Sequence, residues 1–249
     1  MKIQLLSDLH NEFSGSQRAA PIEATDADLI VLAGDIDLGL QGIEWAGRES
    51  KRLGKPLLYV AGNHEFYRHD ISLAASMAAA AKKAGVLFLE NERAVLEGVR
   101  FLGCTLWSDY RAAGDAALAM QTAAESLNDH RLIRNGDHPF MPQDALALHN
   151  RSREWLAAAL AEPFAGKTVV VTHHGPHMLC QHPSHSITPL SAAFWSDLGY
   201  LVEQADVWCF GHSHGNIQTR WGKCRLLCNQ RGYDMENRWD FRPDFVFEV

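Results

Sequence analysis

Five short polar clusters in this sequence combine side chains that commonly bind metal ions. The clusters are Asp8-Leu9-His10, Gly34-Asp35, Gly62-Asn63-His64-Glu65, Thr172-His173-His174 and Gly211-His212-Ser213-His214. Their donors are carboxylate, amide and imidazole groups without a thiolate, a mixture that suits Mn, Fe, Zn, Co or Ni better than a thiolate zinc site. The clusters offer two aspartates, one asparagine and several histidines. About seven protein ligands from this set would be too many for one ion, but they suit two ions that share a carboxylate.

Each cluster directly follows a short apolar run. The runs are residues 2–7, 28–34, 56–62, 167–172 and 207–210. They are rich in Val, Ile and Leu and lack clean alternation, which is typical of strands buried on both faces. In open α/β sheets, functional groups gather beyond the carboxyl ends of the strands. We therefore expect the five clusters to project into one crevice.

Helical patterns lie between these runs, and further strands lie between and after them. Helices are predicted over residues 40–53, 70–84 and 143–161. Additional strands are predicted within residues 86–107, 217–221, 224–228 and 244–249. Alternation of strand and helix in the first half predicts parallel pairing, whereas the hairpin-like second half predicts antiparallel pairing. The expected fold is an α/β domain with a mixed sheet and helices outside it.

The chain is predicted to form a single domain over residues 1–249. It contains no linker rich in Gly, Ser or Pro and no internal repeat. Residues 108–142 carry weak periodicity, so we expect a helical and loop insertion there.

Composition and charge narrow the range of partners. The 249 residues are 47% hydrophobic and 21% charged, as in ordinary globular proteins. The formal net charge is −7 and no basic run occurs, which argues against a nucleic-acid partner held through its phosphates. No apolar stretch approaches the roughly 20 residues that span a bilayer, so no membrane partner is expected. The N-terminus lacks the pattern of a signal peptide, which predicts a cytoplasmic location. The oligomeric state cannot be predicted.

The cysteines predict reduced, buried thiols. There are five of them, an odd number, and they contain no C-x-x-C pair. A disulfide framework or a thiolate metal site is therefore not expected.

Taken in order, the five clusters resemble the calcineurin-like metallophosphoesterases. The pattern of that family is D-x-H, then GD, then GNH followed by D or E, then a histidine after a strand, then GH-x-H. All five blocks are present between residues 8 and 214, which is nearly the whole chain. The resemblance implies a four-layer fold in which two packed mixed β-sheets are flanked by helices.

The resemblance also implies ligands for two metal ions, with Mn or Fe favoured. One ion would be held by Asp8, His10, Asp35 and His214, and the other by Asp35, Asn63, His173 and His212. In that scheme Asp35 bridges the two ions. His174 remains an alternative to His173, although the family usually uses the first histidine of the pair.

A catalytic role is implied for His64. It matches the family position that protonates the leaving group or stabilises the transition state, with Glu65 as its expected orienting neighbour. No substrate-binding residue can be predicted from the sequence.

The function implied is that of a metal-dependent phosphoesterase acting on a small phosphorylated substrate. It would hydrolyse a phosphomonoester or a phosphodiester by in-line attack of a metal-bridging hydroxide. The alternatives are a metal-dependent nuclease, against which the acidic chain argues, and a non-catalytic scaffold with a vestigial site, against which the complete ligand set argues. An amidohydrolase would normally begin with H-x-H instead of the D-x-H found here.

Overall fold

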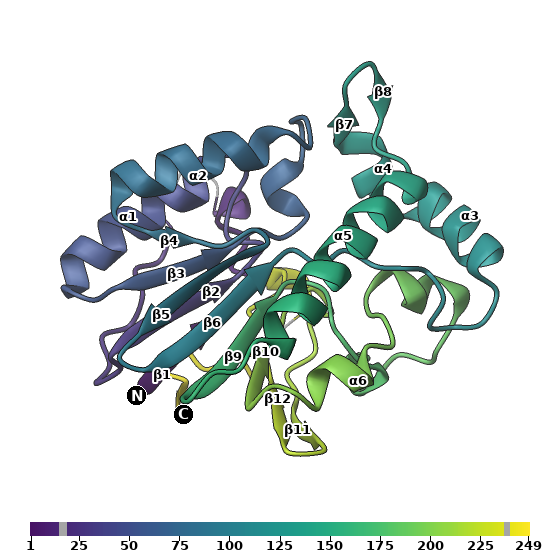
Figure 1. Cartoon of the computed structure of the whole chain (residues 1–249). Coiled ribbons are helices and arrows are strands. Elements are labelled where there is room, and N and C mark those ends of the chain that lie inside the picture. Colours follow the sequence, from purple (N-terminus) through teal and green to yellow (C-terminus); the bar gives the residue numbers. More distant parts are fainter. Residues whose placement is uncertain (15–18, 237–239) are drawn as a thin grey trace.

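Two mixed β-sheets pack face to face in the structure, a computed structural model that describes residues 1–14, 19–236 and 240–249 (Figure 1). The first sheet has the strand order β13-β1-β2-β3-β4, and the second has the order β11-β12-β10-β9-β6-β5. The strands of the first sheet are β1 (Lys2–Leu6), β2 (Leu29–Ala33), β3 (Leu57–Val60), β4 (Leu87–Phe88) and β13 (Val246–Glu248). Those of the second are β5 (Glu92–Leu96), β6 (Val99–Cys104), β9 (Lys167–Thr172), β10 (Val207–Cys209), β11 (Gln218–Trp221) and β12 (Cys224–Leu227).

Both sheets are parallel in the middle and antiparallel at their edges. Strands β1 to β4 pair in parallel, and β13 joins β1 antiparallel. In the second sheet β6, β9, β10 and β12 pair in parallel, while β5 and β11 are antiparallel edges. The prediction of an antiparallel second half is therefore wrong for the centre of that sheet. The physical reason is that helices cross over between β6 and β9 and between β9 and β10, and such crossovers bring strands back in parallel.

Four main helices cover the outer faces of the two sheets. The first sheet carries α1 (Gln41–Leu53) and α2 (Leu73–Ala84), and the second carries α5 (Pro142–Ala161) and α6 (Gly199–Val202) (Figure 1). The three longest of these match the predicted helices to within three residues.

Side chains of β2 show how the four layers are held together. Leu29 and Val31 lie in the apolar cluster between the sheets, where Phe101 and Val169 of the second sheet join them. Ile30 and its neighbours on the other face pack against the helices of the first sheet. Every residue of β2 is fully buried, as its unbroken apolar run predicts. These layers confirm the expected fold of two mixed sheets flanked by helices.

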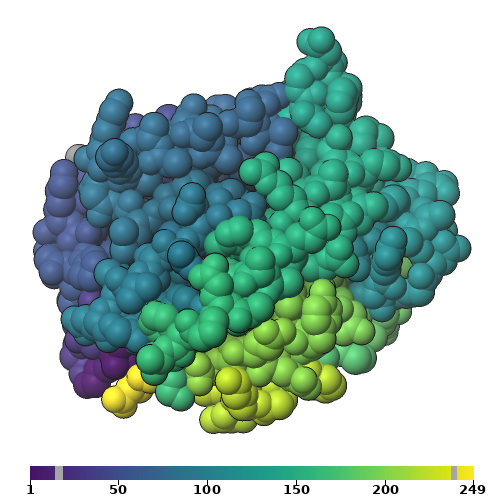
Figure 2. Space-filling view, in the orientation of Figure 1, coloured from purple at the N-terminus to yellow at the C-terminus, as the bar shows by residue number. Residues whose placement is uncertain are grey.

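The segment 108–142 forms small elements beyond the second sheet. They are α3 (Ala116–Ser126), α4 (Asp129–Leu132), β7 (Arg134–Asn135) and β8 (His138–Pro139). The carboxylate of Asp115 caps α3 by accepting hydrogen bonds from two N–H groups of its first turn. The β7–β8 hairpin stands out from the surface in the space-filling view (Figure 2). Helix α3 packs against the 3₁₀ helix Pro189–Ala193, so this segment borders the region that contains the polar clusters.

Two further expectations concern the whole chain. All five cysteines are buried and free, which confirms the prediction of buried thiols. Among the described residues, no helix combines the length and the apolar character needed to cross a bilayer.

Candidate metal centre

The polar clusters converge where the parallel strands of both sheets end. Three groups of side chains place their ligand atoms within 4.8 Å of one another. These groups are Asp8–His10–His214, His10–Asp35–His64 and Asp35–His173–His212. The groups overlap in His10 and Asp35, so they form one continuous centre. All of the histidine and aspartate ligands predicted from the sequence belong to it.

The backbone is strained at most of these positions. Five of the predicted ligands have a left-handed conformation that residues other than glycine rarely adopt, with φ of 53° at Asp8, 46° at His10, 55° at Asp35, 71° at His212 and 51° at His214. Each such residue costs roughly 1 kcal/mol or more. Hydrogen bonds between the loops hold the strained turns, including His10 N–H to the carbonyl of Asp35 and Gly211 N–H to the carbonyl of His173. A concentration of backbone strain of this kind is typical of functional sites.

Gly62 is required by the close approach of two loops. A Cβ atom at this position would overlap Oδ1 of Asp35 and would lie 2.6 Å from the backbone nitrogen of the same residue. Any side chain here would therefore displace the carboxylate at the middle of the centre.

The imidazoles of His10 and His214 bring two ring nitrogens close together at the centre. Nδ1 of His10 donates to Glu12 at 3.1 Å, and Nδ1 of His214 donates to Glu236 at 2.8 Å. Each ring therefore turns Nε2 inward, and the two Nε2 atoms are only 3.0 Å apart. Two unprotonated nitrogens at this distance repel each other unless a cation or a proton lies between them. Ligand nitrogens about 2.1 Å from one metal ion and at right angles to each other are about 3.0 Å apart, so the spacing fits a shared ion.

The same acceptor-to-acceptor arrangement occurs around His173. Its Nδ1 donates to the carbonyl of Ala33 at 2.9 Å, which leaves Nε2 facing Oδ1 of Asn63 at 3.0 Å and Oδ2 of Asp35 at 3.4 Å. The amide nitrogen of Asn63 donates to Asp129 at 2.9 Å, so the amide oxygen must face the centre. Three acceptors thus face one another, and a bound cation would satisfy all of them.

The carboxylates raise the pKa of two of these histidines despite their burial. Burial alone would lower the pKa of His173, but the Asp35 carboxylate raises it to about 9. Burial alone would also lower the pKa of His214, but Asp8 and Glu236 raise it to about 10. These shifts show that the field of the site stabilises a positive charge at both ligand positions.

The side chains of His173 and His174 have different surroundings. Nδ1 of His174 lies 3.3 Å from the carbonyl of Thr105, and its ring packs against that of His212 with centroids 4.1 Å apart. His173, in contrast, is beside Asp35. Nε2 of His212 is buried and has no hydrogen-bond partner among the residues that the structure describes. A buried polar atom without a hydrogen-bond partner is a further indication of a metal-binding position.

His64 lies at the edge of the centre and is held by Glu12. Nδ1 of His64 donates to Oε1 of Glu12 at 2.7 Å, while Nε2 lies 3.1 Å from the hydroxyl of Tyr233 and 3.9 Å from Oδ2 of Asp35. Burial alone would lower the pKa of His64, but the carboxylates of Asp35 and Glu12 raise it. The two carboxylates therefore favour a positive charge on this ring.

The orienting role expected for Glu65 is wrong. Its carboxylate instead accepts hydrogen bonds from the backbone N–H groups of Asp35, Ile36 and Gly62 and from the hydroxyl of Tyr59. Burial and the nearby Asp35 raise the pKa of Glu65 to about 7. Glu65 therefore fixes the loops after β2 and β3 to each other, and Glu12 is the residue that orients His64.

Several residues that contact a predicted ligand or His64 were missed by sequence reasoning. Among them are Glu12, Asp129, Tyr233 and Glu236. Only Glu12 carries a local signal, because it follows His10 by two residues in the same turn. The other three come from segments without a motif.

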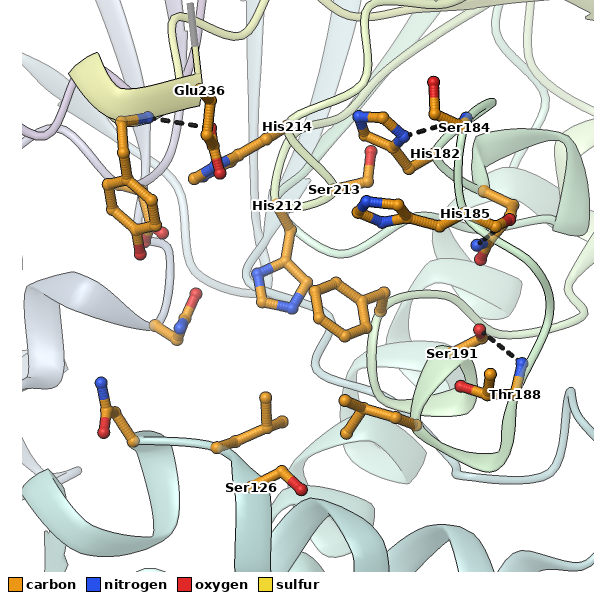
Figure 3. A pocket seen from close by; sticks show the side chains of 18 of the residues that line it. Ser126, His182, Ser184, His185, Thr188, Ser191, His212, Ser213, His214 and Glu236 are labelled. Atoms are coloured by element: carbon orange, nitrogen blue, oxygen red, sulfur yellow. Dashed lines mark hydrogen bonds and ion pairs between the residues drawn. The ribbon is translucent and has the colours of Figure 1, made fainter.

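A cleft of about 1230 Å³ opens from the centre. Figure 3 shows the loop that carries His182 and His185 to the right of His212 and His214, and all four residues line the cleft. The rings of His182 and His185 stack with centroids 4.1 Å apart. These two histidines therefore line the cleft, which is much larger than a phosphate group.

Comparisons with known proteins agree with this geometry. A protein from Acanthamoeba polyphaga mimivirus, described as uncharacterized protein L509, is 24% identical over 212 residues, which is 78% of this chain and 73% of that protein. The crystal structure of phosphopantetheinyl hydrolase (PptH) from Mycobacterium tuberculosis has the same fold, with a TM-score of 0.74, 20% identity, and coverage of 96% of this chain and 93% of that chain. The family model of the calcineurin-like phosphoesterases matches residues 1–216. The chain therefore belongs to the calcineurin-like phosphoesterase family.

Proposed function

We propose that this protein is a dinuclear metal-dependent phosphoesterase that hydrolyses a small phosphomonoester or phosphodiester. The observation that carries the proposal is the position of Asp35 between two sets of inward-facing acceptors. Its Oδ2 lies 3.4 Å from Nε2 of His173 and 3.9 Å from Nε2 of His10. A carboxylate shared in this way is what a pair of ions requires.

The groups on the two sides of Asp35 suggest which ligands would bind each ion. One ion would be bound by Asp8, His10, Asp35 and His214, and the second by Asp35, Asn63, His173 and His212. The ligand set contains only two carboxylates, so two divalent ions leave the centre net positive and able to receive a phosphate ester. Oxygen and imidazole donors without thiolates favour Mn or Fe.

When bound, two such ions supply a nucleophilic water of lowered pKa and a clamp for the attacked phosphoryl group. The chain itself then has to orient the leaving group and provide its proton. His64 is suited to this task because Glu12 holds Nδ1, which leaves Nε2 directed toward the centre. No side-chain nucleophile is needed.

The cleft beside the centre is suited to an organic group attached to the phosphate. The cleft is lined by the His182–His185 pair and by several hydroxyl groups, including those of Ser184 and Ser213 (Figure 3). The structural neighbour from Mycobacterium tuberculosis is named a phosphopantetheinyl hydrolase, so a phosphopantetheine ester belongs in any substrate panel.

Metal stoichiometry and hydrolysis, measured on the same samples, test the proposal. The purified protein would be stripped with a chelator, reloaded with Mn²⁺, Fe²⁺, Zn²⁺ or Co²⁺, and analysed by mass spectrometry of the bound metal. Each sample would then be assayed with 4-nitrophenyl phosphate, bis(4-nitrophenyl) phosphate and the panel. We expect about two ions per chain, loss of hydrolysis on stripping, and recovery on reloading.

The alternatives give different results in this experiment. Two bound ions without hydrolysis of any ester would indicate a non-catalytic scaffold. Fewer than one ion per chain would contradict the ligand assignment. Salt-sensitive binding and cleavage of DNA or RNA would instead indicate a nuclease.

A further inference from the structure

We propose that Glu12 is a positioning residue shared by a metal ligand and by the proton donor, so that one carboxylate links metal binding to leaving-group protonation. The inference rests on the proposed function. It starts from a single oxygen atom: Oε1 of Glu12 accepts from Nδ1 of His10 at 3.1 Å and from Nδ1 of His64 at 2.7 Å.

The position of Glu12 is set by the turn that carries His10. His10 has a left-handed backbone and caps the 3₁₀ helix Asn11–Phe13, which contains Glu12. The N–H of Asn11 donates to the carbonyl of Ile36, so this helix is attached to the loop after β2. The Glu12 side chain is only 8% exposed, and its Oε2 has no hydrogen-bond partner among the described residues. The two histidines are therefore the hydrogen-bond partners that compensate for the burial of this carboxylate.

This contact fixes the tautomer and the orientation of both rings. Each ring must carry its proton on Nδ1 to donate to Glu12, so each must present Nε2 to the centre. The two rings meet edge to face with centroids 4.4 Å apart, which keeps the ligand atom of His10 and the reactive atom of His64 in one fixed relation. Partners of metal-ligating histidines orient such ligands and tune the metal.

Two other outer carboxylates also contact predicted ligands. Glu236 accepts from Nδ1 of His214 and from the N–H of Tyr233, and Asp129 accepts from the amide of Asn63 and from the hydroxyl of Tyr67. Glu12 differs from both because one of its oxygens accepts from the imidazole of a predicted ligand and from that of the proton donor.

The proton moves as follows in the proposed reaction. Hydrolysis adds the oxygen of water to phosphorus and breaks the bond from phosphorus to the leaving oxygen. The leaving oxygen takes the proton from Nε2 of His64. The proton on Nδ1 of the same ring stays there, hydrogen-bonded to Glu12. The proton released by the attacking water returns to the ring through solvent.

Two isosteric variants, Glu12→Gln and a matched control, test the two roles of Glu12. Glu12→Gln weakens the contact to both histidines, whereas the control Glu44→Gln changes an exposed carboxylate on α1 that lies outside the centre. Mn²⁺ affinity would be measured by calorimetry, and kcat would be measured at saturating Mn²⁺. Glu12→Gln should bind Mn²⁺ about 10- to 100-fold more weakly and should remain about 10-fold or more slower at saturating Mn²⁺. Glu44→Gln should match the wild type in both quantities.

A second background tests whether the lost rate passes through His64. In His64→Ala protein, adding Glu12→Gln should cause no further loss of kcat, yet it should still weaken Mn²⁺ binding. A general structural defect would instead lower kcat again in this background and would overturn the proposal.

The remaining outcomes are also decisive. Wild-type kcat in Glu12→Gln at saturating Mn²⁺, or unchanged Mn²⁺ affinity with reduced kcat, would each overturn the shared role. If Glu12→Gln does not fold, Glu12→Asp replaces it, and long-range ¹H–¹⁵N spectra of the Zn²⁺-loaded wild type report the tautomers directly. A proton on Nε2 instead of Nδ1 in neutral His64 would overturn the proposal. Wild-type protein that binds two ions but hydrolyses nothing refutes the phosphoesterase function separately, because calorimetry and spectra still test the contacts of Glu12.

Discussion

The two ends of the cleft are built in different ways. At the metal end, side chains such as Asp8 and His173 are fully buried and each is held by hydrogen bonds from other segments. At the other end, the loop 181–188 is largely exposed, and its hydrogen bonds include local ones such as that from the N–H of Ser184 to Nδ1 of His182. One end therefore lies at buried strand ends, and the other lies on an exposed loop.

This difference indicates how the work of the site is divided. Groups that do chemistry need positions fixed to a fraction of an ångström, and buried strand ends provide them. Groups that select a substrate can sit on loops that change without disturbing the fold. We therefore expect substitutions at the metal end to affect metal binding and kcat, and those at the loop end to affect KM.

The largest expected effect is that of Asp35→Asn. The substitution removes the charge that both ions would share in the proposed centre, so metal content should fall from about two ions per chain to one or none. The kcat/KM for an aryl phosphate should fall by about 10³ or more, which corresponds to about 4 kcal/mol. Metal analysis and steady-state kinetics measure the two quantities. Retention of both ions would contradict the bridging position of Asp35.

A smaller effect is expected for Asp129→Ala. The substitution removes the acceptor that turns the amide oxygen of Asn63 toward the centre, so one of two ions should bind about 10- to 100-fold more weakly. Calorimetry with Mn²⁺ would resolve the weaker site. Asp137→Asn, an exposed change in the same segment, is the matched control and should bind both ions as the wild type does. Equal affinities in the two variants would remove Asp129 from the account of the metal end.

The pH dependence of stability should distinguish metal-free from metal-loaded protein. The pKa values of about 9 for His173 and about 10 for His214 lie above the value of about 6.5 in unfolded chains. The folded metal-free protein therefore binds the extra protons, and the stability they contribute is complete below about pH 6.5 and is lost as the pH rises toward 10. Bound ions replace these protons and should remove the loss.

Melting curves check this expectation. The Tm of the stripped protein should fall between pH 6.5 and pH 10 by more than that of the Zn²⁺-loaded protein. Parallel curves for the two forms would show that these histidines do not hold the positive charge of the metal-free centre.

The smallest effect is expected at the loop end, for His185→Ala. The ring is exposed and stacks on His182, so its loss should leave the Tm and the metal content unchanged. KM should rise several-fold for esters whose organic group fills the cleft, with kcat unchanged. His138→Ala, on the exposed β7–β8 hairpin, should alter neither constant. A loss of kcat in His185→Ala would show that the two ends are not separable.

Much of the metal end could be predicted from the sequence because its side chains lie in motifs at strand ends. Asp8, Asp35 and His212 each follow an apolar run, and the edge of a parallel sheet brings such positions together. The order of the motifs then identified the family, which the comparisons confirm.

What could not be predicted depends on contacts between segments far apart in the sequence. Asp129 reaches Asn63 across 66 positions, and Tyr233 reaches His64 across 169. No local pattern reports such pairs. Glu65 was assigned to His64 because the two are adjacent, but consecutive side chains in a tight turn point in different directions. The parallel centre of the second sheet was missed for a similar reason, since pairing direction depends on crossovers instead of strand composition.

The proposed ligands come from both sheets, and this has a consequence for folding. Asp8, Asp35 and Asn63 follow strands of the first sheet, whereas His173 and His212 follow strands of the second. An intermediate with only one sheet formed would hold at most part of either coordination sphere. Ion capture should thus come late, after the two halves have docked, and once captured the ions oppose their separation.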